Sequence, residues 1–316
     1  MTMANLKPQS LMYLEAFKQM PPIASLEPQT VRDMFAMAPP VEVELAPLAK
    51  IEDRQVPVDG EEINVRIYTP EGQGPFPIFV YYHGGGWVIG DIAISDASCR
   101  MLANKTGRIV VSVDYRLAPE HKFPVPVEDS YAALQWVSEN AASLNGNASN
   151  IVVGGDSAGG NLAAAMTLKS RSENGPAIAG QVLIYPVTAL SYDSQSYQDF
   201  KEGFGLDRDL MIWFGNYYIR NDEDAKNVLV APILEKDLRN LPPAYVLTAE
   251  FDVLRDEGEA YAERLKEAGV TVETSREEGL IHGFFTNMAV FPDDIKGAID
   301  KFAAFLSKVD QEVSRV

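Results

Sequence analysis

Ser157 lies in the pentapeptide GDSAG (155–159), which fits the pattern Gly-x-Ser-x-Gly. The β-branched stretch before it, NIVVGG (150–155), predicts a buried strand, and the alanine-rich stretch after it predicts a helix. A serine on a sharp turn between strand and helix exposes its hydroxyl, and the flanking glycines leave room where a Cβ would clash. The helix start also places positive dipole beside developing negative charge. We therefore interpret Ser157 as a nucleophile.

A serine hydroxyl needs a neighbouring base, and the chain has only three histidines. His282 lies in EGLIHGFF (278–285), on a loop predicted to leave the last strand at its carboxyl end, where enzymes with such sheets bind substrate. His121 lies in a proline-flanked turn and is expected to be an exposed polar residue, while His83 is expected to fix its own loop by a hydrogen bond. The base is therefore predicted to be His282.

The carboxylate that orients the histidine should follow another strand. The stretch PAYVLTAEFDVLRDEG (243–258) predicts a strand that ends near Ala249, so that Asp252 lies on the next loop. Glu250 precedes this loop and Asp256 falls in the following helix, and both compete for the role. We favour Asp252, because a buried carboxylate there would hold one imidazole tautomer and stabilise the imidazolium.

Three consecutive glycines, residues 84–86 in VYYHGGGWVIGD (80–91), follow a predicted strand. When a serine attacks a carbonyl, the oxygen becomes an anion and needs hydrogen-bond donors already in place. Glycines allow backbone amides to approach without intervening side chains. We expect the amides of Gly84 and Gly85, with that of Ala158, to form this oxyanion hole.

Strand-like and helix-like stretches alternate over most of the chain, which predicts a mostly parallel sheet with helices on both faces, an α/β fold. An antiparallel pair at about 50–70, with a turn at Asp59-Gly60, precedes them and makes the sheet mixed. The predicted strands are 77–83, 108–115, 150–156, 179–186, 243–250 and 270–277, and the predicted helices are about 96–106, 127–143, 158–172, 256–268 and 293–309.

The segment 188–233 is too long for a simple crossover between two strands. Its aromatic clusters, and the N-terminal helices that have no place in the sheet layers, predict a helical cap. We expect the cap to comprise residues 1–45 and 188–233, and the catalytic domain to comprise residues 46–187 and 234–316.

The chain has 316 residues and a formal net charge of −18, which disfavours nucleic acid, anionic membranes and anionic substrates. Its start lacks the features of a signal peptide, and no apolar run approaches the roughly 20 residues of a membrane helix. A single cysteine, Cys99, rules out an internal disulfide and fits a reducing compartment. We expect a cytoplasmic protein without stable membrane insertion.

These motifs together resemble the bacterial hormone-sensitive-lipase-like carboxylesterases of the α/β-hydrolase superfamily. The resemblance rests on HGGGWVIGD (83–91), DYRLAPEHKFP (114–124), GDSAGGNLA (155–163), LRDEG (254–258) and IHGF (281–284), in this order. It implies a mostly parallel eight-stranded sheet with a helical cap, and hydrolysis of short- to medium-chain acyl esters by Ser157, Asp252 and His282. Many members form homodimers by pairing an edge strand, here near Val270–Glu277.

The predicted reaction is acyl transfer through an acyl-enzyme, which requires no metal or organic cofactor. A small neutral ester is the expected substrate, because an apolar lid and a negative field favour it. The candidate pocket residues are Trp87, Phe204, Met211, Trp213, Phe214 and Tyr217, with Tyr13 and Phe17 from the N-terminal segment.

Two other functions are compatible with this scaffold. An amidase or arylformamidase would use the same residues on an amide, and only paired substrates separate it from an esterase. A non-catalytic small-molecule receptor is the second alternative. Such receptors typically lack the histidine, whereas Ser157, Asp252 and His282 are all present here.

Overall fold

The computed structural model describes residues 5–37 and 42–315 of the chain. Eight strands form one sheet in the order β1-β2-β4-β3-β5-β6-β7-β8, in which β2 is antiparallel to β1 and β4 and the other neighbours are parallel. The strands are β1 (Lys50–Val58), β2 (Glu61–Thr69), β3 (Phe76–Tyr82), β4 (Ile109–Val113), β5 (Gly146–Asp156), β6 (Gly180–Ile184), β7 (Ala244–Phe251) and β8 (Val272–Ile281). The predicted mixed, mostly parallel sheet is confirmed.

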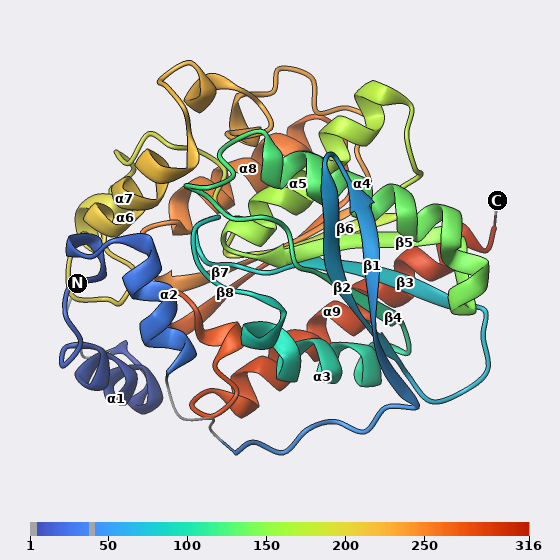
Figure 1. The fold of residues 1–316 in the computed structure, drawn as a ribbon, viewed down its shortest axis with the longest axis horizontal. Coiled ribbons are helices and arrows are strands. Elements are labelled where there is room, and N and C mark those ends of the chain that lie inside the picture. Colours follow the sequence, from blue (N-terminus) through green and yellow to red (C-terminus); the bar gives the residue numbers. More distant parts are fainter. Residues whose placement is uncertain (1–4, 38–41, 316) are drawn as a thin grey trace.

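Helices cover both faces of this sheet. In Figure 1, α4, α5 and α8 lie on one face and α3 and α9 lie together on the other. These helices are α3 (Asp96–Thr106), α4 (Val125–Asn140), α5 (Ala158–Glu173), α8 (Arg255–Glu267) and α9 (Pro292–Val313). The central elements lie in the interior, since every residue of β4 and residues 158–170 of α5 are buried. Continuous apolar runs are typical of strands covered on both faces.

The remaining helices gather at one end of the molecule (Figure 1). They are α1 (Pro8–Phe17) and α2 (Pro28–Ala36) from the N-terminal segment, and α6 (Gln195–Asp199) and α7 (Arg208–Tyr218) from the insertion between β6 and β7. Trp213 Nε1 of α7 donates to the carbonyl of Leu26 at 3.2 Å, so the two segments are in contact. The predicted cap boundaries stay a prediction, and residues 1–4 and 38–41 of that cap lie outside the described residues.

The carboxyl ends of three parallel strands bring the candidate residues to one edge of the sheet. Strand β5 ends at Asp156, β7 ends at Phe251 and β8 ends at Ile281. Phe251 and Ile281 are paired in register, so the residues that follow them, Asp252 and His282, start from neighbouring positions. The sheet thereby positions residues that are far apart in the sequence.

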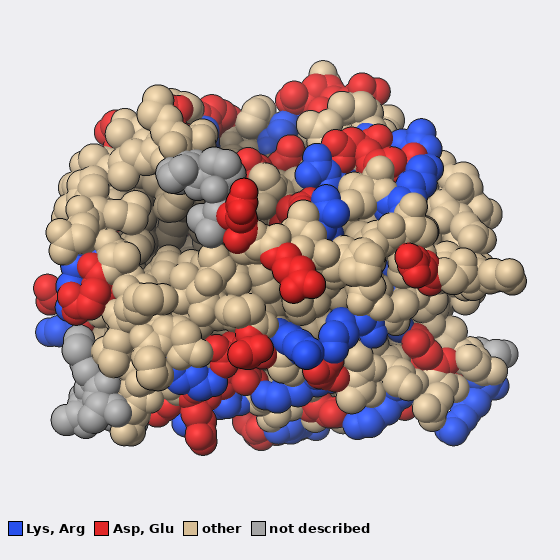
Figure 2. Space-filling view, turned by 90° about the horizontal axis from the view of Figure 1, so that it is seen from below, with Lys and Arg blue, Asp and Glu red and all other residues tan. Residues whose placement is uncertain are grey.

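Charged side chains of both signs are interspersed over much of the face seen in Figure 2, where uncharged side chains border a hollow. Within the described residues, no helix is both long enough and apolar enough to cross a bilayer.

Candidate active site

Ser157 lies on the turn between β5 and α5, with φ 56° and ψ −118°. This is a left-handed backbone conformation that a non-glycine residue adopts only when its surroundings enforce it. An added Cβ on Gly155 or Gly159 would overlap the carbonyl of Tyr82 in the neighbouring strand β3. Both glycines are therefore needed for the tight turn that exposes the serine hydroxyl, as the sequence pattern predicts.

Ser157, His282 and Asp252 form a continuous row of hydrogen bonds. His282 Nε2 lies 2.9 Å from Ser157 Oγ, and His282 Nδ1 lies 2.7 Å from Asp252 Oδ2. Because a carboxylate only accepts, the ring donates from Nδ1 to Asp252 and its Nε2 accepts the serine proton. Asp252 is 1% exposed, and its other oxygen accepts the amide of Leu254 at 2.9 Å. The arrangement can move a proton from the serine to the imidazole.

The competing acids serve other partners. Glu250 Oε2 accepts the amide of Gly279 at 2.7 Å, and Asp256 accepts the amide of Ser196 at 2.7 Å. Of the three carboxylates considered from the sequence, only Asp252 is hydrogen-bonded to His282 among the residues that the structure describes.

The structure corrects the prediction for Gly84. Its amide donates to Oδ1 of Asp156 at 2.9 Å, so it is not directed at the space beside Ser157. An added Cβ on Gly84 would overlap the same carboxylate, which explains why the position is a glycine. Burial raises the pKa of Asp156, and a hydrogen bond from the Tyr81 hydroxyl at 2.6 Å offsets this in part. Asp156 thus ties the loop that carries the three glycines (residues 83–91, here called the oxyanion loop) to the turn that carries Ser157.

The orientation of the Gly85 amide follows from the peptide plane that it shares with the Gly84 carbonyl. His83 Nδ1 donates to that carbonyl at 2.7 Å, and in a trans peptide the next N–H points the opposite way. The His83 ring stacks on Tyr115 with ring centroids 4.3 Å apart, and the Tyr115 hydroxyl donates to the His83 carbonyl at 2.7 Å. As expected from the sequence, His83 fixes its own loop by a hydrogen bond.

Gly86 is a further candidate donor, which was not singled out from the sequence. The Gly85 carbonyl, which shares a peptide plane with the Gly86 amide, accepts from Val88 at 3.1 Å and from Ile89 at 2.9 Å. Within residues 5–37 and 42–315, neither the Gly85 nor the Gly86 amide has a hydrogen-bond acceptor. The amide of Ala158, at the first position of α5, has no partner within the helix either. The run of three glycines was the feature of the sequence that could have indicated Gly86 as a candidate donor.

Tyr185 supports the imidazole and was also missed by the sequence analysis. It follows β6, has a φ of 34°, and packs its ring against that of His282 with centroids 4.5 Å apart and planes tilted by 53°. A bulky residue with positive φ is strained, and such strain persists only where the surrounding structure enforces it. Here the strained backbone holds an aromatic face against the candidate base.

The structure corrects the prediction that Trp87 forms a wall of the pocket. Trp87 is 0% exposed and stacks on Tyr218 of α7 with ring centroids 4.1 Å apart. It therefore packs in the interior. Its φ of 61° shows that the chain turns sharply at this residue.

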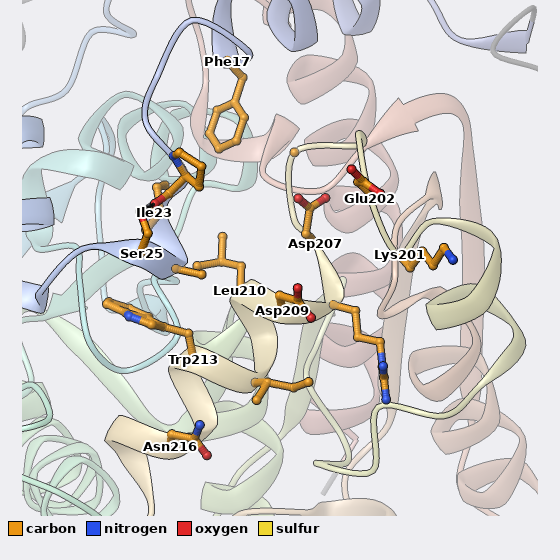
Figure 3. Close-up of a pocket in the computed structure, with 15 residues that line it drawn as sticks. Phe17, Ile23, Ser25, Lys201, Glu202, Asp207, Asp209, Leu210, Trp213 and Asn216 are labelled. Carbon is orange, nitrogen blue, oxygen red and sulfur yellow. Dashed lines mark hydrogen bonds between the residues drawn. The ribbon is translucent and has the colours of Figure 1, made fainter.

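A hollow of about 760 Å³ lies between the N-terminal segment and α7. In Figure 3, Phe17 points into it from one side, opposite Leu210 and Trp213, with Glu202 and Asp207 at another side. Among the described residues, its lining does not include Ser157, Asp252 or His282. Of the predicted pocket residues, Trp213 and Phe17 line it.

The other predicted pocket residues do not line this hollow. Phe204 stacks on Phe251 with centroids 5.7 Å apart, and Met211 is 1% exposed. The Tyr217 hydroxyl lies 3.3 Å from a Glu27 carboxylate oxygen. An added Cβ on Gly86 would overlap the ring of Phe214, so this ring lies directly against the oxyanion loop. Phe214 is thus the member of this group with a demonstrated contact to that loop.

No group of three or more His, Cys, Asp or Glu side chains in the described residues is arranged to hold a metal ion.

Comparison with known proteins gives one consistent picture. A family described as alpha/beta hydrolase fold matches residues 79–286. Carboxylesterase NlhH of Mycobacterium tuberculosis is 44% identical over 254 residues, 79% of this chain and 80% of that protein. An arylesterase of Saccharolobus solfataricus is 40% identical over 257 residues, 81% of this chain and 82% of that protein.

Among solved structures, a hyperthermophilic esterase from the archaeon Pyrobaculum calidifontis superposes with a TM-score of 0.89 at 39% identity. The superposition covers 98% of this chain and 99% of that one. The predicted fold and family are therefore confirmed. The chain belongs to the hormone-sensitive-lipase-like family of α/β hydrolases and is a carboxylic ester hydrolase.

Proposed function

We propose that this enzyme hydrolyses short- to medium-chain acyl esters with Ser157 as nucleophile, His282 as general base and Asp252 as the acid that orients it. The observation that carries the proposal is the row of hydrogen bonds, 2.9 Å from Ser157 Oγ to His282 Nε2 and 2.7 Å from His282 Nδ1 to Asp252 Oδ2. A nucleophile, a base and an orienting group within hydrogen-bond reach are the arrangement that nucleophilic acyl transfer requires.

In the first half-reaction, Ser157 Oγ forms a bond to the ester carbonyl carbon while His282 Nε2 takes the hydroxyl proton. The carbonyl oxygen becomes an anion, for which the amides of Gly85, Gly86 and Ala158 are the proposed donors. The bond from the carbonyl carbon to the alkoxy oxygen then breaks. The alcohol leaves with the proton from Nε2, and the acyl group remains on Ser157.

In the second half-reaction, water takes the place of the alcohol. His282 Nε2 accepts a proton from the water as its oxygen attacks the acyl carbon. The bond to Ser157 Oγ breaks, Oγ regains the proton from Nε2, and the carboxylic acid is released. The Asp252 carboxylate stabilises the imidazolium that forms in both halves.

The substrate is proposed to be a neutral ester of modest size. Relatives named carboxylesterase and arylesterase favour an ester over an amide. The apolar ring of Phe214 lies directly against Gly86, one of the proposed donors, and the chain has a net charge of −18. An anionic ester would be repelled by such a field.

A panel of p-nitrophenyl esters of increasing acyl length tests the activity, with the matching p-nitroanilides as amide counterparts. We expect kcat/KM to be highest for short or medium chains and far lower for every anilide. Anilides cleaved as fast as esters would identify an amidase instead. A fluorophosphonate probe should label the peptide that contains Ser157, with Ser157→Ala as the unlabelled control. Absence of label in the wild type would favour the receptor alternative.

A homodimer through β8 is part of the proposal, because β8 lies at the end of the sheet and, in the part of the chain that the structure describes, is paired only with β7. An edge strand offers unpaired backbone groups to a second chain. Light scattering of the wild type and of Thr274→Pro, which removes one backbone donor from the edge strand, tests this proposal. We expect the wild type to be a dimer and Thr274→Pro to shift toward monomer.

A cytoplasmic location is also proposed, since the single cysteine, Cys99, is buried and reduced.

A further inference from the structure

Arg32 of α2 makes four hydrogen bonds that join the N-terminal segment to the body of the enzyme. Its Nε donates to the Val88 carbonyl at 2.8 Å and its Nη2 donates to the Ala118 carbonyl at 2.6 Å. Nη1 and Nη2 also donate to the two carboxylate oxygens of Glu120, each at 2.9 Å. The Arg32 side chain is 20% exposed, so most of it lies out of solvent.

Val88 is part of the turn that orients the oxyanion loop. Its amide donates to the Gly85 carbonyl at 3.1 Å, and the amide of Ile89 donates to the same carbonyl at 2.9 Å. These two bonds set the peptide plane that carries the Gly86 amide. The Val88 carbonyl and the Ile89 amide also belong to one peptide plane, so Arg32, by holding that carbonyl, restrains a donor to Gly85.

The segment that contains Ala118, whose carbonyl also accepts from Arg32, is joined to the same loop. The amide of Ala118 donates to the Trp87 carbonyl at 2.9 Å. Arg32 therefore binds two carbonyls from two loop segments, and these segments are also hydrogen-bonded to each other. The planar fork of an arginine can satisfy two carbonyls and a carboxylate together, which the compact ammonium of a lysine cannot do.

We propose that Arg32 is a positioning residue for the oxyanion loop: by binding the Val88 and Ala118 carbonyls, it fixes the turn that aims the Gly86 amide. The inference rests on the proposed function of that amide. It gives helix α2 a part in catalysis, although none of its atoms contacts the reacting groups. Glu120 holds the guanidinium from the outside, and the ion pair lowers the pKa of Glu120.

The test compares Arg32→Met with Glu120→Gln and with Lys7→Met. Lys7→Met is the matched control, because Lys7 Nζ donates to Asp294 at 2.6 Å and so also fastens the N-terminal segment to the body, away from the oxyanion loop. We expect Arg32→Met to lower kcat between about tenfold and a hundredfold, with KM changed by less than about threefold, since small misplacement of catalytic groups costs this much. Glu120→Gln and Lys7→Met should keep kcat within about threefold of the wild type, because neither removes the carbonyl contacts.

Two further measurements keep the result interpretable. Arg32→Lys, which retains the charge without the fork, should lie between the wild type and Arg32→Met in kcat, and it is the decisive variant if Arg32→Met does not fold. The rate constant for phosphonylation of Ser157 by a p-nitrophenyl phosphonate should fall in parallel with kcat, because its phosphoryl oxygen uses the same amides.

The proposal is overturned if Arg32→Lys has the kcat of the wild type, or if Glu120→Gln or Lys7→Met lowers kcat as much as Arg32→Met does. A failure of the proposed function looks different, because the wild type itself would then hydrolyse no ester of the panel.

Discussion

The amide of Gly84 donates to Oδ1 of Asp156 at 2.9 Å, which bonds the first glycine of the oxyanion loop to the residue that precedes Ser157. The nucleophile turn and the oxyanion loop therefore share a carboxylate that is buried between them. This contact leaves the amides of Gly85 and Gly86, with that of Ala158, as the proposed donors to a substrate oxygen. Preorganised donors of this kind supply a large part of the rate in acyl transfer.

The Asp156 contact predicts a role in turnover without contact to substrate. Asp156→Asn keeps the shape but replaces a charged acceptor by a neutral one, so the bonds from Gly84 and Tyr81 weaken. We expect kcat to fall about tenfold with KM nearly unchanged. Tyr81→Phe, which removes one donor and leaves Gly84 bonded, should cost less. Steady-state kinetics on one p-nitrophenyl ester measures both variants, and a wild-type kcat in Asp156→Asn would contradict the prediction.

Ser157→Ala removes the proposed nucleophile. We expect kcat to fall by about 10⁶, as such losses do in serine hydrolases. The melting temperature should not fall, because the substitution retains the strained turn. The hydroxyl's partner is Nε2 of His282, whose side chain is 12% exposed. Turnover even at a tenth of the wild-type value would exclude Ser157 as the nucleophile.

Asp252→Asn should be the damaging change among the neighbouring acids. An asparagine amide at this position favours the wrong imidazole tautomer, and we expect a loss of about 10⁴ in kcat. Glu250→Gln and Asp256→Asn are the controls, since these carboxylates bind the amides of Gly279 and Ser196 instead. The assignment is wrong if either control proves more damaging than Asp252→Asn in kcat measured under the same conditions.

Tyr185 should act through its ring and not through its hydroxyl. Tyr185→Phe keeps the surface against His282 and is expected to retain kcat within about threefold, whereas Tyr185→Ala lets the imidazole move and should lower kcat at least tenfold. Loss of a buried aromatic also costs about 3–5 kcal/mol of folding stability. Kinetics is therefore measured well below the melting temperature of each variant. Equal kcat values for the two variants would contradict the role.

Glu257 predicts a dependence of stability on pH. Burial raises the pKa of Glu257 to about 8, and its Oε1 accepts the amides of Thr188 at 2.6 Å and Ala189 at 3.1 Å. From the ordinary pKa of a glutamic acid, about 4.3, up to about 8, the unfolded chain binds fewer protons at this site than the folded protein. The free energy of unfolding therefore falls as the pH rises through this window, and the site's contribution is lost above it.

Glu257→Gln removes this titration and keeps an oxygen that can accept both amides. We expect the variant to match the wild type near pH 5 and to exceed its free energy of unfolding by more than about 1 kcal/mol at pH 8, since each pKa unit corresponds to 1.36 kcal/mol. Urea unfolding at a series of pH values measures the difference. A constant difference between the two proteins from pH 5 to pH 8 would show that Glu257 does not titrate in this window.

The strands and the order of the chemical residues are local properties, which explains why they could be predicted. The β-branched run before Ser157 and the strand before Asp252 are readable from composition and period, and each candidate residue follows a strand directly in the structure. Parallel strands end at one edge of a sheet, so their following residues converge. The geometry between His282 and its two partners then follows from the pairing of β7 with β8 and the position of β5.

The direction in which a backbone amide points and the partner against which an aromatic ring packs are not local properties. Gly84, Gly85 and Gly86 are identical in the sequence, and only the fold turns the first toward Asp156. Trp87 reads as a pocket wall from its place after the glycines, but packing on Tyr218 buries it. The ring of Tyr185 against His282 joins residues about a hundred positions apart, so no periodic pattern could indicate it.

By itself, the sequence of this protein determined its layers of strands and helices, its family, and which serine, acid and histidine are the candidates for the chemistry, because side-chain period and residue type act over short stretches. The tertiary structure decided that the Gly84 amide is bonded to Asp156, which aromatic rings line a hollow and which merely pack, and that Arg32 reaches the oxyanion loop from a separate helix. These depend on contacts between distant segments, whose hydrogen bonds select one orientation among several that the local backbone allows.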